Sequence, residues 1–224
     1  MLYSWFFKVN TLRDALDGVT MDLTEIVRSR RSIRKFKPEK IPREVLRFLL
    51  DLARWSPSAH NSQPWRLIVV DDTNMKARLA KEMNDVWISD LVRDGVEKTE
   101  AEKRVKSKNW ERVTSSSAVI MVCLDKEVVH KHLDSRRRRV EYLTAVQSVA
   151  AYIQTLLLIS HDHDLGACWT CTPLFCSRRV QGVLGLPNNL EPQAMVIMGF
   201  PDEKPLASPR KSIDEICAFN SWRE

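Results

Sequence analysis

Apolar residues recur at helical spacing in two segments near the start of the chain. From Asp22 up to an arginine-rich segment, the apolar positions fall three and four residues apart, as in an amphipathic helix. Pro42 then begins a second helical pattern, in keeping with the preference of proline for the first turn of a helix. The apolar face of this second helix consists of Val45, Leu46, Leu49, Leu50 and Ala53. The pattern therefore predicts two helices that each pack one face on a core.

Three short apolar runs, at residues 66–70, 118–124 and 194–200, predict buried strands. Residues 75–113 are strongly charged and predict helices between the first two strands. Residues 139–160 are apolar nearly all round, which indicates a central helix buried on several sides. That segment is too short, and too polar at its start, to be a membrane span. The elements together predict an α+β fold.

The chain has no composition break, internal repeat or low-complexity segment that would divide it. Residues 1–20 precede a more conventional opening at Met21. They form a packing arm, or else the natural start lies at Met21. We therefore expect an N-terminal extension at residues 1–20 and a single domain over residues 21–224.

The composition is that of a soluble globular protein, with 44% apolar and 29% charged residues in 224. A net charge of +6 favours anionic ligands or surfaces, although simple solubility explains it equally well. Five cysteines without regular spacing indicate a reducing compartment. The first ten residues lack the basic lead and the cleavage site of a signal peptide. We expect a cytoplasmic protein.

The segment RSRRSIRKF, at residues 28–36, gathers cations just before the chain breaks at Pro38. Guanidinium groups bind phosphate through two parallel hydrogen bonds, and a serine hydroxyl adds a donor. A solvated basic helix end is the alternative explanation. The six glycines form neither GxGxxG nor GxxxxGK[ST], so a phosphate site in this chain is built from side chains.

The segment PSAHNSQPW, at residues 57–65, contains two prolines that bracket five polar side chains with no glycine among them. An ordinary connection uses flexible turn-forming residues. A loop held rigid by prolines at both ends indicates that its polar groups are positioned for a purpose.

These two segments, read with LGACW at 165–169, LGLP at 184–187, GFP at 199–201 and Arg210, resemble the FMN-dependent nitroreductase family. The resemblance covers roughly residues 22–222. It implies an α+β sandwich with a central mixed sheet flanked by helices. It also implies an obligate homodimer with two FMN sites at the subunit interface, so that residues 21–224 are one FMN-binding domain.

The resemblance also implies roles for particular residues. Arg30 and Ser32 match phosphate ligands, and Arg31 lies near the ribityl chain or the phosphate. Arg34 matches the cation beside flavin N1 and O2, where reduction of FMN places negative charge. Arg210, with Lys211 as the weaker candidate, closes on the phosphate.

The loop at 57–65 is then expected to face the flavin that the partner subunit mainly binds. Residues 168–172, expected as a loop after the central helix, would offer backbone N–H groups to flavin N5. No side chain is expected to be catalytic, because FMN carries the chemistry. The residues assigned to the cofactor are Arg30, Arg31, Ser32, Arg34, Pro57, Ser58, Ala59, Asn61, Trp169, Thr170, Cys171, Thr172, Arg210 and Lys211.

The implied activity is an oxidoreductase that takes hydride from NADH or NADPH and reduces a nitroaromatic, quinone or flavin acceptor by a ping-pong mechanism. Two alternatives keep the flavin: a benzimidazole synthase that fragments it, and a flavoprotein associated with cofactor F420 biosynthesis. A remote alternative is a basic nucleic-acid-binding or scaffold protein, which rests on net charge and on RRRR at 136–139. We expect neither a nucleic-acid nor a membrane partner.

Three further groups of residues suggest chemistry more weakly. Cys168 and Cys171 form a CxxC, which is explained as flavin-loop backbone rather than a redox dithiol. HDHD at 161–164 and the pair His130 and His132 are explained as helix capping and solvated charge rather than metal ligands. His60 is expected as a surface or interface residue, so no metal site is predicted.

Overall fold

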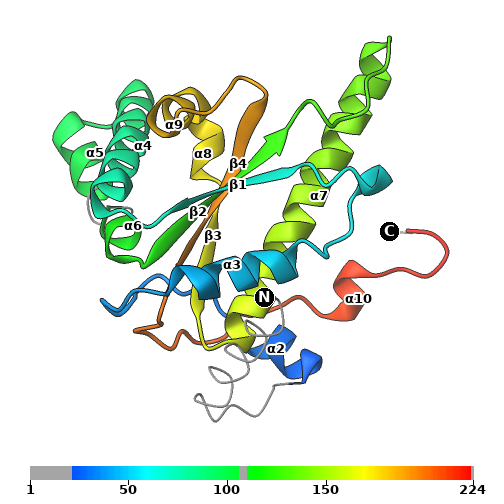
Figure 1. Ribbon diagram of the computed structural model, residues 1–224, viewed down its shortest axis with the longest axis horizontal. Helices are drawn as coiled ribbons and strands as arrows, with labels where there is room; N and C mark the ends of the chain where they lie inside the picture. The colour runs from blue at the N-terminus through cyan, green and yellow to red at the C-terminus, as the bar shows by residue number, and fades with distance from the viewer. Residues whose placement is uncertain (1–21, 106–109, 223–224) are drawn as a thin grey trace.

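The computed structural model describes residues 22–105 and 110–222. The expected extension at residues 1–20 and four residues of the charged segment therefore lie outside the described part. The strands are β1 (Trp65–Val70), β2 (Ala118–Asp125), β3 (Gly166–Thr170) and β4 (Leu190–Gly199). They form one sheet in the order β1-β2-β4-β3, and all three neighbouring pairs are antiparallel (Figure 1). In the described chain, parallel pairing occurs at an isolated bridge between Ser32 and Ala167.

Two layers of helices cover the two faces of the sheet (Figure 1). One face carries α3 (Arg43–Ala53) and α7 (Ser135–Asp162). The other face carries α4 (Thr73–Arg93), with α5 (Lys98–Val105) and α6 (Glu111–Ser115) against it, and α8 (Thr172–Phe175) and α9 (Ser177–Leu184). The short elements are α2 (Leu23–Ser29), the 3-10 helix η1 (Ala59–Asn61) and α10 (Ile213–Ile216).

The side chains of β2 alternate between the two layers, as the two-residue period of a strand requires. Ile120 and Val122 belong to the core under α3 and α7, whereas Val119 and Met121 belong to the core under α4 and α9. Every residue of β2 is buried, which explains its continuous apolar sequence. The predicted α+β sandwich is confirmed.

The central helix α7 runs from Ser135 to Asp162, a few residues beyond each predicted end. It starts early because the side chain of Asp134 accepts a hydrogen bond of 2.8 Å from the backbone N–H of Arg137. By length and composition alone α7 resembles a membrane span. Its apolar residues instead pack on α3 and on the sheet, in the same core as Ile120. The four arginines of its first turn are exposed, as expected for a solvated helix start.

The prediction that residues 168–172 form a loop is wrong for Cys168 to Thr170, which belong to β3. The strand has five residues and begins with glycine, so its local pattern is weak. It forms because it pairs with the end of β4, from Gly166 opposite Gly199 to Thr170 opposite Met195. Such pairing between distant segments is not visible in a local sequence window.

Two glycines allow the segment at residues 32–37 to lie against the sheet. A Cβ atom on Gly166 would stand 2.7 Å from Cγ2 and 2.9 Å from Cβ of Ile33. A Cβ atom on Gly199 would stand 2.8 Å from the ring of Phe36. Both distances are far below van der Waals contact, so only glycine fits without a shift of the neighbouring segment.

We expect Gly166→Ala to lower the free energy of unfolding by about 1–3 kcal/mol, because overpacking at a close contact forces neighbouring backbone to move. Gly182→Ala is the matched control. Gly182 lies inside α9 with open space at its Cβ position, where alanine gains up to about 1 kcal/mol of helix propensity. Urea unfolding of both variants gives the comparison. Equal stability of the two variants would contradict the close packing of Ile33 on Gly166.

Candidate functional site

The arginine-rich segment leaves the end of α2 and runs alongside the first residues of β3. The backbone N–H of Ile33 donates a hydrogen bond of 3.0 Å to the carbonyl oxygen of Ala167. Further along, the carboxylate of Glu203 accepts a hydrogen bond of 3.2 Å from the backbone N–H of Lys35. These contacts fix the segment at the edge of the sheet. Its cations are therefore carried by backbone that is held at both ends.

The cations Arg30, Arg31, Arg34 and Arg210, which we call the arginine cluster, meet beside β3. The pKa of Arg30 lies below its usual value, first because the group is partly buried and then because Arg31 and Arg210 stand close to it. Burial also raises the pKa of the nearby Cys168 thiol, against the opposing charges of Arg34 and Arg30. Arg210 thus lies close to Arg30, although 180 positions separate the two residues in the sequence. Lys211 is exposed.

No described carboxylate pairs with the guanidinium groups of the arginine cluster. Arg31 Nη1 donates to the carbonyl oxygen of Arg28 at 2.7 Å, and Arg210 Nη1 donates to that of Ser208 at 3.1 Å. Arg34 Nη1 donates to the carbonyl oxygen of Ser32 at 3.3 Å. The Glu203 carboxylate accepts a hydrogen bond of 2.5 Å from the backbone N–H of Arg34 and not from its guanidinium group. The neighbouring guanidinium groups repel each other, and a bound anion would relieve that repulsion. The cluster has the donor set and the charge for a phosphate group.

His161 lies beside this cluster, although the sequence pattern predicts only a role in capping the helix. Its Nε2 lies 2.7 Å from Ser29 Oγ. Burial, followed by the charge of Arg30, lowers the pKa of His161 below its usual value. A histidine near the end of a helix is common, so the sequence held no signal that would have placed His161 here.

The loop at residues 57–65 has strained backbone between its two prolines. His60, Asn61 and Gln63 have φ angles of 55°, 51° and 44°, in the left-handed region that costs a non-glycine residue roughly 1–2 kcal/mol. Strained backbone of this kind tends to lie at functional sites. The backbone N–H of Gln63 donates 3.0 Å to Ser58 Oγ, so this hydroxyl is used within the loop. The Asn61 side chain is exposed.

The loop and the arginine cluster sit at different places along α7. The backbone N–H of Ala59 donates to Ser148 Oγ at 3.1 Å, whereas the Ser29 side of the cluster contacts His161. Ser148 and His161 are 13 residues apart, or about 20 Å at the helical rise of 1.5 Å per residue. Within one chain, the structure does not bring the two predicted halves of the site together.

The strand β3 and the turn after it contain the other residues that the sequence assigns to the cofactor, and β3 lies beside the arginine cluster. It is the last strand of the sheet, so its outer edge beyond the bridge at Ala167 has no neighbouring strand in the described chain. Trp169 Nε1 is buried and lacks a hydrogen-bond partner among the described residues. Such an orphan donor is uncommon in folded proteins. The side chains of Thr170 and Thr172 hydrogen-bond to each other at 2.8 Å.

The CxxC does not have the properties of a reactive dithiol. Both thiols are free, Cys168 is buried and Cys171 is exposed. Burial raises the pKa of Cys168, whereas a reactive cysteine needs a lowered pKa and access to solvent. These residues therefore serve the site through their place on β3 and in the turn that follows it.

Comparisons with known proteins give one consistent result. The sequence profile described as the nitroreductase family matches residues 27–200. YfhC of Bacillus subtilis (strain 168), whose name gives it as an NAD(P)H nitroreductase, is 28% identical over 191 residues, or 85% of this chain and 90% of YfhC.

Two solved structures show the same fold. A BluB-like flavoprotein from Clostridium difficile 630 superposes with a TM-score of 0.75 at 21% identity, covering 90% of this chain and 100% of that one. An NADPH:FMN oxidoreductase from Vibrio harveyi, complexed with NAD⁺, gives a TM-score of 0.68 at 19% identity, covering 90% and 78%.

We expect His161→Gln to weaken the pH dependence of stability. Because folding lowers the pKa of His161, the folded state favours the neutral ring. The stabilisation is complete above the unfolded pKa of about 6.5 and is lost as the pH falls below it. Between pH 7.5 and 5.5, the wild-type free energy of unfolding should therefore fall more than that of the variant, as measured by urea unfolding. Parallel pH profiles would contradict the burial of His161 beside Arg30.

Proposed function

The chain belongs to the nitroreductase family, and from this premise we propose that it is an FMN-dependent oxidoreductase that uses NADH or NADPH to reduce a small electron-poor acceptor. The observation that carries the proposal is the arginine cluster beside the edge strand β3. Arg30 and Arg31 are partly buried in it, and no described carboxylate forms an ion pair with its guanidinium groups. A flavin mononucleotide has one phosphate for such a cluster and a flat ring system for the edge of the sheet.

The arginine cluster fits the phosphate end of FMN. Arg30, Arg31 and Arg210 would hold the phosphate. Arg31 and Arg210 already lie close enough to Arg30 to lower its pKa. Ser32 lies in the bridge to Ala167 and would add a hydroxyl donor. Arg34 is exposed on the same held segment and would place its charge beside the ring system.

The remaining predicted residues would serve the ring system. The outer edge of β3, with Trp169 and Thr170, supplies backbone groups that no described strand uses, followed by Cys171 and Thr172. When bound, FMN supplies hydride acceptance from the nicotinamide and electron donation to the acceptor. The chain's own part is to bind the cofactor, to orient it and to keep a cation beside the edge where negative charge develops.

We further propose that the protein acts as a homodimer in which each flavin contacts both chains. The separation of about 20 Å along α7 keeps the loop at 57–65 away from the arginine cluster of its own chain, so the loop would face the flavin of a partner. The C-terminal tail supports such an assembly. Its large apolar side chains are more than half exposed: Leu206, Ile213, Ile216, Phe219 and Trp222. Apolar groups gathered in this way usually mark an interface.

Binding a phosphate-bearing cofactor does not by itself decide the reaction. The flavin-fragmenting and F420-associated alternatives would use the same cluster, so they differ from the leading proposal only in what happens to the flavin. The basic scaffold alternative rests on the arginines at 136–139, which are exposed at the start of α7 and form an ordinary solvated helix end.

The experiment is to purify the full-length protein, measure flavin per chain, and mix it without oxygen with NADH or NADPH. We expect bleaching of the flavin absorbance by at least one nucleotide, and reoxidation by a nitroaromatic or a quinone with intact FMN recovered. Recovery of a fragmented flavin would favour the benzimidazole synthase instead. A colourless protein that takes up no added FMN would refute the proposal.

A charge-reversal pair tests the binding residues directly. Arg30→Glu should lower the affinity for FMN by more than about tenfold, because losing a charge-assisted hydrogen bond costs about 1.5–3 kcal/mol and the new carboxylate repels phosphate. Arg136→Glu makes the same change of charge on the exposed start of α7 and should leave the affinity nearly unchanged. Fluorescence titration of FMN measures both, and equal losses would show that only net charge matters.

A further inference from the structure

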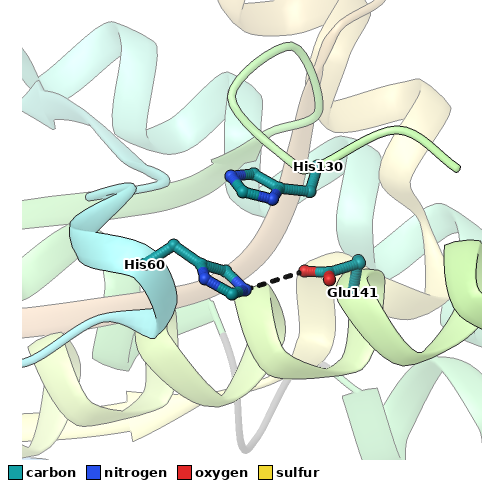
Figure 2. A group of neighbouring side chains, drawn as sticks. All are labelled: His60, His130 and Glu141. Carbon is teal, nitrogen blue, oxygen red and sulfur yellow. Dashed lines mark ion pairs between the residues drawn. The ribbon is translucent and has the colours of Figure 1, made fainter.

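Three metal-ligating side chains from separate segments meet on the outer side of the loop at 57–65. His60 comes from η1, His130 from the connection between β2 and α7, and Glu141 from the second turn of α7 (Figure 2). One ligand atom from each residue lies within 4.8 Å of the others. No local sequence motif groups these residues, because 70 positions separate His60 from His130 and 11 separate His130 from Glu141.

The geometry of the three groups is close to that of a metal site before the ion binds. His60 Nε2 lies 3.4 Å from Glu141 Oε2. Two ligand atoms bonded to tetrahedral zinc at about 2.0–2.1 Å would be about 3.4 Å apart. The rings of His60 and His130 are stacked, with centroids 4.3 Å apart and an angle of 10° between the planes, as Figure 2 shows. The lone pair of an imidazole nitrogen lies in the plane of its ring, so one of the two stacked rings would have to rotate for both to bind the same ion.

A fourth residue supports the carboxylate. His132 Nε2 lies 3.2 Å from Glu141 Oε1, which is the oxygen that does not face His60. In metal sites, an outer hydrogen bond of this kind fixes the orientation of a ligating carboxylate.

A small cavity and a strained backbone lie beside the three side chains. A cavity of about 10 Å³ adjoins the group, lined by Ala59, His60, His130, Glu141 and Thr144 among others, which is about the size needed for one water molecule or ion. His60 carries left-handed backbone angles, with φ at 55°. A bond from its ring to an ion would offset part of the cost of that conformation.

We propose that His60, His130 and Glu141 form a binding site for a divalent transition-metal ion of the Zn²⁺ type, with His132 as the residue that positions Glu141. Two imidazoles and one carboxylate suit such an ion and do not suit Mg²⁺ or Ca²⁺, which take oxygen ligands. The group is partly exposed, so water completes the coordination. This site is the alternative to the solvated charge that the sequence predicts for His130 and His132.

The ion would attach the loop at 57–65 to α7. The backbone N–H of Ala59 already holds the loop to α7 at Ser148. Coordination would add a second attachment, from His60 to Glu141, about two turns nearer to the start of the helix. The proposal needs no flavin, and its test is independent of the oxidoreductase activity.

The test uses the full-length protein with its natural cofactor content and without a histidine tag. The five free thiols are a second place for zinc, so the exposed Cys217 is replaced by serine and the protein is kept reduced. Calorimetric titration with Zn²⁺ should show one ion per chain. Titration with Co²⁺ should give ligand-field absorption without the thiolate charge-transfer band.

Variants identify the ligands. Glu141→Gln and His130→Asn should each weaken Zn²⁺ binding by more than about tenfold, and His132→Asn by about 10–100-fold, which is the usual effect of losing an outer hydrogen bond. His163→Asn is the matched control, because His163 lies at the far end of α7 against Phe48. Circular dichroism of each variant checks that it is folded.

Three results would overturn the proposal. The first is the absence of a one-to-one Zn²⁺ complex in the wild-type protein. The second is an affinity that stays the same in the folded Glu141→Gln and His130→Asn variants, which would show that zinc binds elsewhere. A Co²⁺ spectrum with a thiolate band would likewise assign the ion to the remaining cysteines.

Discussion

The close contact between Ile33 and Gly166 is the constraint on which the proposed flavin site depends. Because Gly166 has no side chain, the segment after α2 can lie directly against the first residue of β3 and bond to Ala167. That contact carries Arg30, Ser32 and Arg34 to the edge of the sheet, where Arg210 joins them. A second glycine, Gly199, does the same for Phe36. The two glycines therefore determine where the segment that carries Arg30, Arg31 and Arg34 lies on the sheet.

The second constraint is the length of α7. From Ala145 to Ser160 one side of this helix is buried in the core, so this part is a rigid spacer between the loop at 57–65 and the arginine cluster. A rigid helix keeps the two groups about 20 Å apart in one chain. A single flavin that used both groups would have to draw them from two chains. The exposed apolar tail is consistent with the same arrangement, because it leaves the body of its own chain with large side chains uncovered.

The sequence predicted the elements whose pattern is local. The strand at 118–124, the helix after Pro42 and the central helix were found because burial imposes a period that a short window shows. The strand β3 was missed, because five residues with a glycine carry little pattern and its formation depends on β4, 20 residues later. The assignment of Arg210 and Arg30 to the same phosphate comes from the family resemblance, because no periodicity of the sequence relates the two residues. His161 and the His60–His130–Glu141 group depend on how distant segments pack, which no local pattern encodes.

The central claim, that each flavin site is built from two chains, is tested most directly with mixed dimers. Arg30→Glu puts a negative charge against the phosphate, and Asn61→Trp fills the space beside the flavin from the other chain. Each variant alone should bind little FMN. Differently tagged subunits of the two variants, co-purified as a heterodimer, would contain one site with both defects and one intact site. The account predicts recovery of up to half the wild-type flavin per heterodimer. Heterodimers that form and still bind no FMN would contradict it, because the loop would then serve its own chain.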